Sequence, residues 1–447
     1  MTDTALRSIP AAPGRIPLVG HLWALWREPL AFLQSLSEVG ELVRVDLGPM
    51  PVYVVTTPGL QQQVLTTHAA SFTRGRIYDR ARSLFGNGLA TSDGGYHLRQ
   101  RRLVQPAFHR TRIAGYAEVM NDRTRERAGS WHAGQVVAVD RSMHELTLGI
   151  AVDALFADGL DPATTGEIHG LVPAIMAGIP VRMATPARLD RWPIVPANRR
   201  FDAAAERLRA LVDELVAARR HDHRGRGSGD LLSLLLDARD ADTGEAMTDV
   251  QVCDEVISLL LAGTETPGTT LSWAFYELAR HPEVEARLHA EVDATVGTGP
   301  VGLEDLARLE YTARVLQEVL RLHPTLLFTR RATRSVALGG VHLPAGTEVA
   351  YSPYALHRDP RTYPQPTHFD PDRWLPGRSA PSHETFSPFG AGRHKCLGEA
   401  FGWTEMMIAV AVVAARWRLR VAEGHVVREV PAEVPRPGAL PMTVLPR

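Results

Sequence analysis

One cysteine in a glycine-rich segment carries the clearest chemical signal in the chain. Residues 389–398 read Phe-Gly-Ala-Gly-Arg-His-Lys-Cys-Leu-Gly, which places Cys396 after two glycines. Gly390 and Gly392 permit tight turns and a close approach of the backbone. We expect a helix to begin at Leu397, because N–H groups at a helix N terminus stabilise a thiolate and lower its pKa.

The neighbours of this cysteine favour metal ligation. Phe389 and Leu397 can shield the sulfur of Cys396 from water. A shielded thiolate that accepts backbone hydrogen bonds suits haem iron as a strong donor ligand. The alternative is an ordinary buried cysteine beside a glycine turn. Cys253 lies in an apolar helical segment without such a context, and we expect it to be a core residue.

A second chemical signal lies at the centre of a long apolar segment, residues 249–280. Its apolar side chains recur at helical spacing, but Gly263, Glu265 and Thr266 interrupt them. Such breaks are often found at functional sites. Pro267 lacks the N–H that would bond the carbonyl of Gly263, which predicts a local opening of the helix. The alternative is a helix kink with capping side chains.

Two further patterns place charges on one helix face. Glu318 and Arg321 are three residues apart, and Arg373 follows downstream in Phe-Asp-Pro-Asp-Arg-Trp. Alone, this spacing predicts only a surface ion pair. His97 and Arg101 are one helical turn apart, so they could bind an anion together or belong to a solvated basic face.

The composition of the chain limits the classes of protein to which these residues can belong. The 447 residues are 45% hydrophobic and 22% charged, with a formal net charge of −1, so the total gives no indication of a nucleic-acid partner. Two cysteines are not a disulfide framework, and a reducing cytoplasm fits best. No apolar run reaches the ~18–20 residues of a membrane span. The first residues do not read as a secretory signal.

The elements that must position these side chains are mostly helical. Residues 42–47 and 51–56 predict a β-hairpin around Gly48-Pro49, and residues 336–349 predict strands with a turn at Gly339-Gly340. Between them, residues 96–320 are mainly helical, and an apolar helix follows Cys396. Three more segments complete the prediction: a helix at 203–219, an exposed loop at 221–229, and an amphipathic stretch at 17–26 that we expect to pack against the protein. The predicted fold class is mainly α with small β-sheets.

The whole pattern Phe-Gly-x-Gly-x-His-x-Cys-x-Gly resembles the ligand loop of the cytochromes P-450. The Glu-x-x-Arg pair and the second arginine resemble the same family in order and spacing, and the resemblance spans about residues 14–440. It implies a single domain over residues 1–447, in which 1–20 form an N-terminal extension without a transmembrane helix. It also implies that haem lies between the long helix and the cysteine loop.

The resemblance implies a role for each motif. Haem b would be bound axially by Cys396, with Phe389 beside it and Gly263 on the other face. Thr266 would hydrogen-bond dioxygen, and Glu265 would help to relay protons. The predicted contacts to the haem propionates are His97, Arg101, Arg330 and His394, with Arg331 as a rival to Arg330. Glu318, Arg321 and Arg373 would form a buried network that braces the cysteine loop.

The predicted substrate is apolar. The regions that wall the pocket in the family supply mostly apolar side chains here, namely Ile77, Tyr78, Leu84, Phe85, Leu89, Ile175, Met176, Ile257, Leu260, Leu261, Leu326, Leu327 and Phe328. Such a pocket suits a compact terpene better than a sugar or a charged acid. The chain as a whole resembles the bacterial sesquiterpene oxygenases of antibiotic pathways, which implies stepwise oxidation of a methyl group to an alcohol and an aldehyde.

The resemblance implies a haem-thiolate monooxygenase that uses dioxygen. No Gly-x-Gly-x-x-Gly motif follows a strand, so we expect electrons from a separate ferredoxin and ferredoxin reductase, which would dock near Arg393 and Lys395. Alternatives are another hydrophobic metabolite or a fatty acid as substrate, and a reductase-independent isomerase or peroxygenase. A further alternative is a haem carrier or gas sensor.

Overall fold

Helices make up most of the chain in the computed structural model, which describes residues 6, 8–157, 160–184, 196–221, 230–378 and 384–447. The helices are α2 (Leu22–Arg27), α3 (Pro29–Val39), α4 (Pro58–Gln62), α5 (Arg76–Phe85), α6 (Gly94–Val104), α7 (Arg110–Gly129), α8 (Val139–Phe156), α9 (Pro162–Ala184), α10 (Pro196–His221), α11 (Leu231–Asp237), α12 (Asp249–Arg280), α13 (Pro282–Thr295), α14 (Leu303–Leu306), α15 (Glu310–Leu322), α16 (Pro353–Leu356) and α17 (Glu399–Ala414). Short 3₁₀ or π turns lie at Gln63–Thr67, Ala69–Ser71, Gln105–Phe108, Pro371–Trp374 and Gly392–His394.

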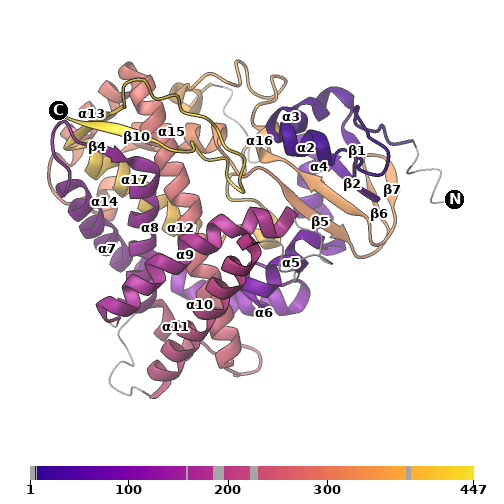
Figure 1. Ribbon diagram of the computed structural model, residues 1–447, viewed down its shortest axis with the longest axis horizontal. Coiled ribbons are helices and arrows are strands. Elements are labelled where there is room, and N and C mark those ends of the chain that lie inside the picture. The colour runs from indigo at the N-terminus through magenta and orange to yellow at the C-terminus, as the bar shows by residue number, and fades with distance from the viewer. Residues whose placement is uncertain (1–5, 7, 158–159, 185–195, 222–229, 379–383) are drawn as a thin grey trace.

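Strands form three small sheets within the described residues. The largest has the order β1-β2-β8-β5-β3 and lies beside the N-terminal helices, apart from the helical bulk (Figure 1). A second has the order β4-β10-β9, and β6 pairs with β7. The strands are β1 (Leu42–Leu47), β2 (Met50–Val55), β3 (Phe72–Arg74), β4 (Val136–Ala138), β5 (Phe328–Ala332), β6 (Val336–Leu338), β7 (Val341–Leu343), β8 (Glu348–Tyr351), β9 (Trp417–Val421) and β10 (Pro441–Pro446).

The predicted turns and fold class are confirmed. β1 and β2 pair antiparallel as the hairpin around Gly48, and β6 and β7 turn through Gly339 and Gly340. All three glycines have a positive φ, which L side chains rarely adopt. The predicted helix at 203–219 lies inside α10. Of the predicted loop 221–229, only His221, the last residue of α10, lies within the described residues.

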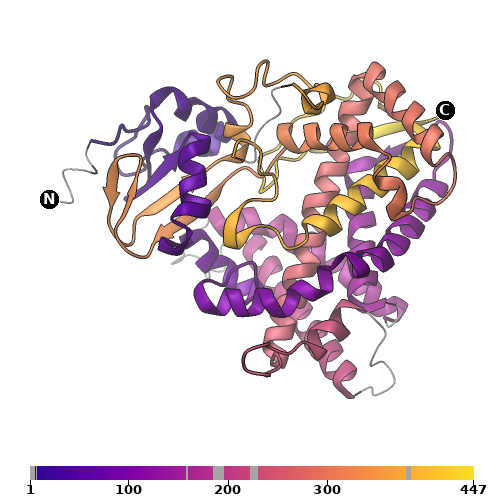
Figure 2. The same cartoon turned by 180° about the vertical axis from the view of Figure 1, so that it is seen from behind.

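Helix α12 runs through the core with the bounds that its periodicity predicts. It begins at a capping box, in which the Thr248 hydroxyl accepts from the N–H of Gln251 and the Gln251 side chain accepts in return. Most of its side chains are buried, and it contacts α8, α10 and α17 (Figure 2). The helix continues through Pro267, and the Thr266 hydroxyl donates to the Ala262 carbonyl at 3.0 Å.

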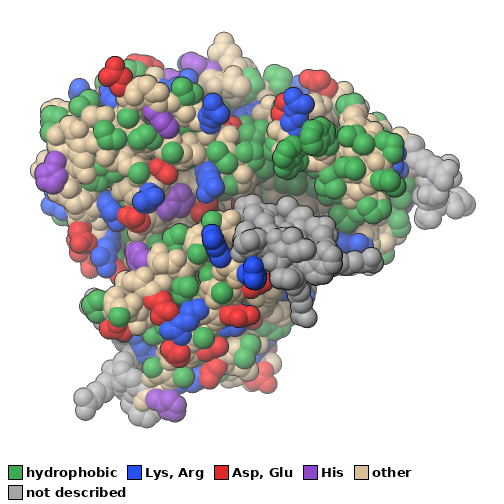
Figure 3. All heavy atoms as spheres, in the orientation of Figure 1, with side chains coloured by type: hydrophobic (Ala, Val, Ile, Leu, Met, Phe, Trp, Pro, Cys, Tyr) green, Lys and Arg blue, Asp and Glu red, His purple; other side chains and the backbone are tan. Residues whose placement is uncertain are grey.

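The N-terminal segment differs from its prediction. Residues 9–20 lie along β1, with Ile9 and Ala12 buried, but α2 buries no side chain. Leu18 is 93% exposed and Trp26 is 74% exposed, so the expected packing of residues 17–26 against the protein holds only in part, at the buried His21 and at Leu25 beside the core. Apolar side chains therefore gather on the surface over the N-terminal helices (Figure 3). Among the described residues, none of the helices has the length and apolarity to cross a membrane.

Candidate active site

The cysteine loop is a tight turn that is held by backbone hydrogen bonds. The N–H of Cys396 donates to the Phe389 carbonyl at 2.8 Å, and the N–H of Gly390 donates to Ser387 at 2.9 Å. Gly392 has φ +67°, and a Cβ there would lie 2.0 Å from the carbonyl oxygen of Leu65. Only glycine fits this close contact, so the second glycine of the motif fixes the loop against the turn at Gln63–Thr67.

The Cys396 thiol is exposed and yet strongly desolvated. Burial raises the pKa of the Cys396 thiol, and a hydrogen bond from the Gly398 N–H opposes this only in part. The sulfur is therefore accessible to a ligand although protein surrounds much of it. Cys253, in contrast, is fully buried in the core, as predicted.

One detail of the predicted cysteine environment is wrong. Helix α17 begins at Glu399, with Gly398 as its N-cap, instead of at Leu397. The N–H of Gly398 at this helix start does lower the pKa of the Cys396 thiol, as predicted, but desolvation outweighs it and the net shift is upward.

One face of α12 is open at its centre. Ala262 is exposed, whereas Leu260, Leu261 and Thr264 around it are buried. Thr266, one turn later on the same face, is partly exposed. A side chain at Gly263 would contact Ala151 of α8 at 3.5 Å, so the open face of this turn belongs to Ala262.

Glu265 points toward α8. Its Oε2 lies 3.4 Å from Nε2 of His144, whose Nδ1 bonds the Asp140 carbonyl at 2.7 Å. Burial opposes charge on both groups, but their mutual hydrogen bond outweighs it: the pKa of His144 is raised and the pKa of Glu265 is lowered. The acid predicted to relay protons is therefore an ion-pair partner of a histidine that the sequence analysis did not identify.

Two arginines from neighbouring strands gather near the cysteine loop. Arg330 is 5% exposed and lies over the Tyr351 ring at 5.8 Å. Arg74, at the end of β3, donates to the Leu89 carbonyl at 2.8 Å. Burial lowers the pKa of Arg74, and the nearby Arg330 adds to this effect. Two guanidinium groups that repel each other in a desolvated place suit an anionic ligand.

The rival Arg331 is occupied elsewhere. Its Nε donates to Glu348 at 2.6 Å, and its terminal nitrogen donates to Asp79 at 2.7 Å. Because two carboxylates already satisfy its charge, the structure favours Arg330 over Arg331 as the cation that faces the interior.

Two histidines stack beside these arginines. The rings of His97 and His394 have centroids 4.4 Å apart. His97 is buried, contacts Ser92 Oγ at 3.2 Å and the Arg393 carbonyl at 3.3 Å, and burial lowers its pKa to about 4. Both ring nitrogens of His394 lack a hydrogen-bond partner among the described residues.

A carboxylate approaches His394 without forming an ion pair. Asp93 lies 3.5 Å from its Nε2. Burial and the nearby Arg74 and Arg330 hold the pKa of His394 well below its usual range, so the ring is neutral and its nitrogens stay available. Arg101, the other predicted anion contact, donates to the Lys395 carbonyl at 2.6 Å and thereby holds the cysteine loop.

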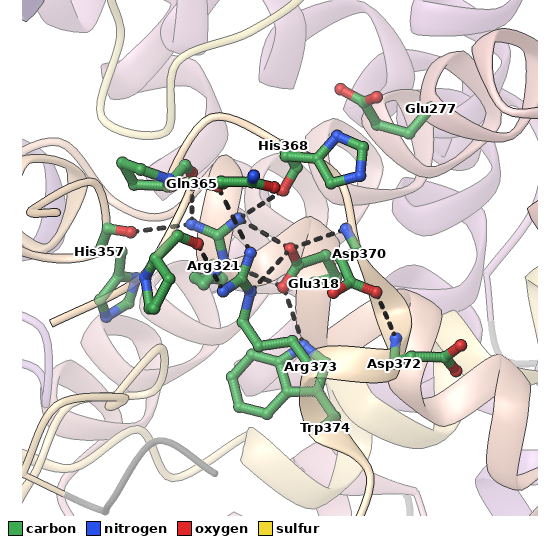
Figure 4. Close-up of polar contacts among 12 residues, drawn as sticks. Glu277, Glu318, Arg321, His357, Gln365, His368, Asp370, Asp372, Arg373 and Trp374 are labelled. Carbon is green, nitrogen blue, oxygen red and sulfur yellow. Dashed lines mark hydrogen bonds and ion pairs between the residues drawn. The ribbon is translucent and has the colours of Figure 1, made fainter. Parts of the chain in front are cut away.

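Glu318 and Arg321 form a fully buried ion pair in α15 (Figure 4). Arg321 donates through Nε to Oε2 at 2.9 Å and through a terminal nitrogen to Oε1 at 2.7 Å, so the pair is bidentate. Glu318 also accepts from Arg373 at 3.3 Å and from the Trp374 indole at 2.9 Å. The structure thus brings the three predicted charged residues together.

The same pair ties α15 to the chain before the cysteine loop. Arg321 donates to the carbonyls of His357, Pro366 and His368 at 2.7–3.1 Å (Figure 4). The Trp374 ring packs on Phe386 with centroids 4.3 Å apart. Phe386 precedes Phe389 by three residues, so this contact connects the buried charges to the loop.

The predicted apolar wall divides into two groups. Five of its residues are fully buried in the core and line no hollow, so their prediction is wrong: Leu84, Ile175, Ile257, Leu260 and Leu261. They occupy helix faces that pack on neighbouring helices. The rest retain exposed surface: Ile77, Tyr78, Phe85, Leu89, Met176, Leu326, Leu327 and Phe328. Glu433 near the C terminus, which no sequence motif marks, is also exposed, and burial nevertheless raises the pKa of its carboxyl.

These features fit haem. An accessible thiol inside the molecule can ligate iron, and the small Ala262 leaves room on the face of α12. The partly exposed Arg74 and the buried Arg330, together with the His394 ring that lacks a hydrogen-bond partner among the described residues, supply donors for two carboxylates.

Comparison with known proteins places these features in one family. The family profile described as Cytochrome P450 matches residues 10–437. Cyclooctat-9-en-7-ol 5-monooxygenase of Streptomyces melanosporofaciens is 43% identical over 438 residues, 98% of this chain and 95% of that protein. Pentalenene oxygenase of Streptomyces avermitilis is 39% identical over 421 residues, covering 94% and 93%. The crystal structure of the cytochrome P450DA heme domain superposes with a TM-score of 0.87 at 28% identity, covering 98% of this chain and 97% of that one.

Proposed function

Because this chain belongs to the cytochrome P450 family, and is therefore a monooxygenase with a cysteine-ligated haem, we propose that it hydroxylates an apolar cyclic terpenoid. The observation that carries the proposal is the similarity, over nearly the whole chain, to two bacterial terpenoid oxygenases. The partly exposed apolar residues before β5 and along α5 support it, because they suit a hydrocarbon-like ligand.

Cys396 is the proposed ligand of the iron. Its backbone N–H is already bonded to Phe389, so the loop holds the sulfur in place before any ligand binds. Arg74, Arg330 and His394 are the proposed partners of the haem propionates. When bound, the haem activates dioxygen for insertion into a C–H bond.

His97 and Arg101 act through the loop in this proposal. Both already contact carbonyls of the cysteine loop, at Arg393 and Lys395. Their proposed role is to hold that loop beside the haem edge, with the free N–H groups of Arg101 still able to reach a propionate.

Thr266 holds the proton closest to the reacting oxygen in the proposed mechanism. Its hydroxyl lies on the open face of α12 and donates to the Ala262 carbonyl at rest. It can turn to donate to a ligand in the hollow without breaking the helix. Glu265 directly precedes Thr266 in the chain and is paired with His144. In this proposal, protons pass from that pair toward Thr266 through water.

The finer substrate assignment starts from pentalenene. Similarity to pentalenene oxygenase supports stepwise oxidation of one methyl group to an alcohol and an aldehyde, in the pentalenolactone pathway. Cyclooctat-9-en-7-ol 5-monooxygenase is at least as similar to this chain as pentalenene oxygenase is. Cyclooctat-9-en-7-ol, a larger terpenoid alcohol, is therefore the second substrate to test.

Electrons come from a separate protein in this proposal. We assign that role to a ferredoxin and its reductase in the cytoplasm, docking near Arg393 and Lys395. Lys395 is exposed and paired with Glu399, and within the described residues Arg393 has no acidic partner. A free guanidinium beside the cysteine loop suits an acidic surface.

A reconstitution assay tests the function. We expect oxidised terpenoid only when dioxygen, NADPH, ferredoxin and ferredoxin reductase are all present, with pentalenene and cyclooctat-9-en-7-ol as substrates. Product formed without a reductant, or from peroxide alone at the same rate, would identify an isomerase or peroxygenase instead. Oxidation of a fatty acid but neither terpenoid would contradict the substrate class.

A further inference from the structure

A loop of the C-terminal chain carries a carboxylic acid, Glu433, between α12 and the segment before β5. Glu433 belongs to a loop between Val430 and Arg436, whose backbones exchange hydrogen bonds of 2.8 and 2.9 Å. The Glu433 carbonyl accepts from the N–H of Leu326 at 2.7 Å, just before β5. Two residues later, the Pro435 carbonyl accepts a hydrogen bond from the Trp273 indole of α12 at 2.6 Å. The loop is thus fixed between α12 and the segment before β5.

The position of the Glu433 side chain follows from two observations. It is exposed, whereas Val434 and Pro435 beside it are buried. Its nearest charges are Glu265 of α12 and Arg74 of β3, which lie on separate elements around the hollow. Burial raises the pKa of Glu433, Glu265 adds to this, and Arg74 opposes it. An accessible but desolvated carboxyl among these groups faces the interior and not bulk water.

Glu433 has unused hydrogen-bonding capacity. Among the described residues, no side chain or backbone group hydrogen-bonds its carboxyl. Glu265 is engaged by His144, and Arg74 donates to Leu89 and Ser92. A carboxyl beside apolar residues such as Leu326 and Leu327 is costly unless a ligand completes its hydrogen bonds.

The chemistry of the site selects the kind of ligand. The side chains before β5 are apolar, so a charged ligand would lose its hydration there without compensation. A neutral hydroxyl both donates and accepts, so it can bond a carboxyl in either protonation state. Its carbon skeleton would then contact the apolar residues before β5.

We propose that Glu433 binds a hydroxyl group of the substrate, so that the enzyme prefers a terpenoid that already carries one oxygen over the parent hydrocarbon. This inference rests on the proposed terpenoid oxygenase function. It places the enzyme after a reaction that installs the first hydroxyl, either an earlier oxygenation or a cyclisation that ends by capture of water.

Matched hydrocarbon–alcohol pairs test the preference. The probes are pentalenene with its primary alcohol, and cedrene with cedrol, titrated into the haem-loaded protein. Kd is measured by calorimetry and by the change in haem absorption. We expect wild type to bind the alcohol of at least one pair about 10-fold more tightly than the hydrocarbon, as a buried hydrogen bond allows.

Three variants separate the hydrogen bond from other effects. Glu433→Leu should reduce that preference to about twofold or less and leave hydrocarbon binding equal or tighter. Glu433→Gln, which can still bond a hydroxyl, should keep most of it. Glu423→Leu removes an exposed carboxylate of the same C-terminal region and should change neither Kd. The haem spectrum of each variant reports whether it has folded.

The outcomes of these experiments test the role of Glu433 separately from the proposed terpenoid oxygenase function. If wild type binds the terpenoids without preference for the alcohols, or if Glu433→Leu keeps the preference, the role of Glu433 is refuted and the terpenoid function stands. If none of the four probes binds, the terpenoid function fails and the inference fails with it.

Discussion

At the scale of single residues, the hydroxyl of Thr266 is a partly exposed group on the open face of α12. We expect Thr266→Ala to keep haem binding but to raise reductant use per product several-fold, because a removed proton donor typically costs 10²–10⁴ in the step it serves. The measurement is the ratio of NADPH consumed to product formed. Thr266→Ser keeps the hydroxyl and should restore coupling. Unchanged coupling in Thr266→Ala would move the proton donor elsewhere.

The ion pair of His144 and Glu265 predicts a pH-dependent stability. The raised pKa of His144 stabilises the fold below its ordinary value of 6.5, and this is lost as pH rises through the raised pKa. The lowered pKa of Glu265 stabilises the fold above its ordinary value of 4.5, and this is lost as pH falls through the lowered pKa. The pair therefore contributes most between about pH 4.5 and 6.5.

We expect His144→Gln to be destabilised by about 1 kcal/mol in that window, and by clearly less at pH 8.5. Urea unfolding of wild type and variant at pH 5.5 and 8.5 measures the difference. An equal deficit at both pH values would show that His144 acts by packing and not by charge.

These residues differ in how far sequence alone could identify them. Cys396 and its glycines form one continuous pattern, so the loop was predictable from local spacing. His144 and Glu433 come from elements more than a hundred residues from Glu265, and nothing in their own neighbourhoods marks them. Their roles exist only once α8, α12 and the C-terminal loop pack together.

At the scale of elements, the cysteine loop depends on a glycine at 392. We expect Gly392→Ala to destabilise the protein by about 3 kcal/mol or more, because a positive φ costs about 1–2 kcal/mol and the contact with Leu65 adds overpacking. Gly377→Ala is the control, since Gly377 has φ +85° but open space around it. Equal losses in urea unfolding would mean that the close contact with Leu65 contributes nothing.

The buried Glu318–Arg321 pair in α15 is expected to contribute strongly to stability, although ion pairs at this i, i+3 spacing usually contribute little. Arg321→Ala leaves Glu318 buried without its main partner, and we expect a loss of about 3–5 kcal/mol or failure to fold. Arg308→Ala removes an arginine at the same i, i+3 spacing that is 60% exposed, and should cost under about 1 kcal/mol.

Thermal or urea unfolding compares these two variants. Arg321→Lys keeps a charge without bidentate geometry and should fall between them, which keeps the comparison informative if Arg321→Ala does not fold. Similar losses for Arg321→Ala and Arg308→Ala would contradict the bracing role.

Element boundaries were predictable where the signal is local. The capping box at Thr248 and the periodicity up to Arg280 define α12 correctly. The start of α17 was misplaced because Leu397 is apolar and fits the helical pattern, whereas Gly398 takes the cap position. Burial on α12 was misjudged for Ile257 and Leu260, since periodicity alone does not say which neighbour each face meets.

At the scale of the whole molecule, the fold class was predictable but the arrangement was not. Mixed helices and small sheets follow from pattern and turn residues, and similarity to the P450DA heme domain confirms the fold. The pairing of β2 with β8 joins segments about three hundred residues apart, which no local signal specifies. The exposed Trp23 and Trp26 likewise depend on how residues 9–20 lie along β1.

The central claim is that Cys396 ligates the haem iron as a thiolate. The most direct measurement is the absorption difference spectrum of the reduced, haem-loaded protein with and without carbon monoxide, for wild type and Cys253→Ala. We predict a strongly red-shifted Soret band in both and its loss in Cys396→Ala. A band typical of histidine-ligated haem in the folded wild type, or loss of the red-shifted band in Cys253→Ala alone, would contradict the account.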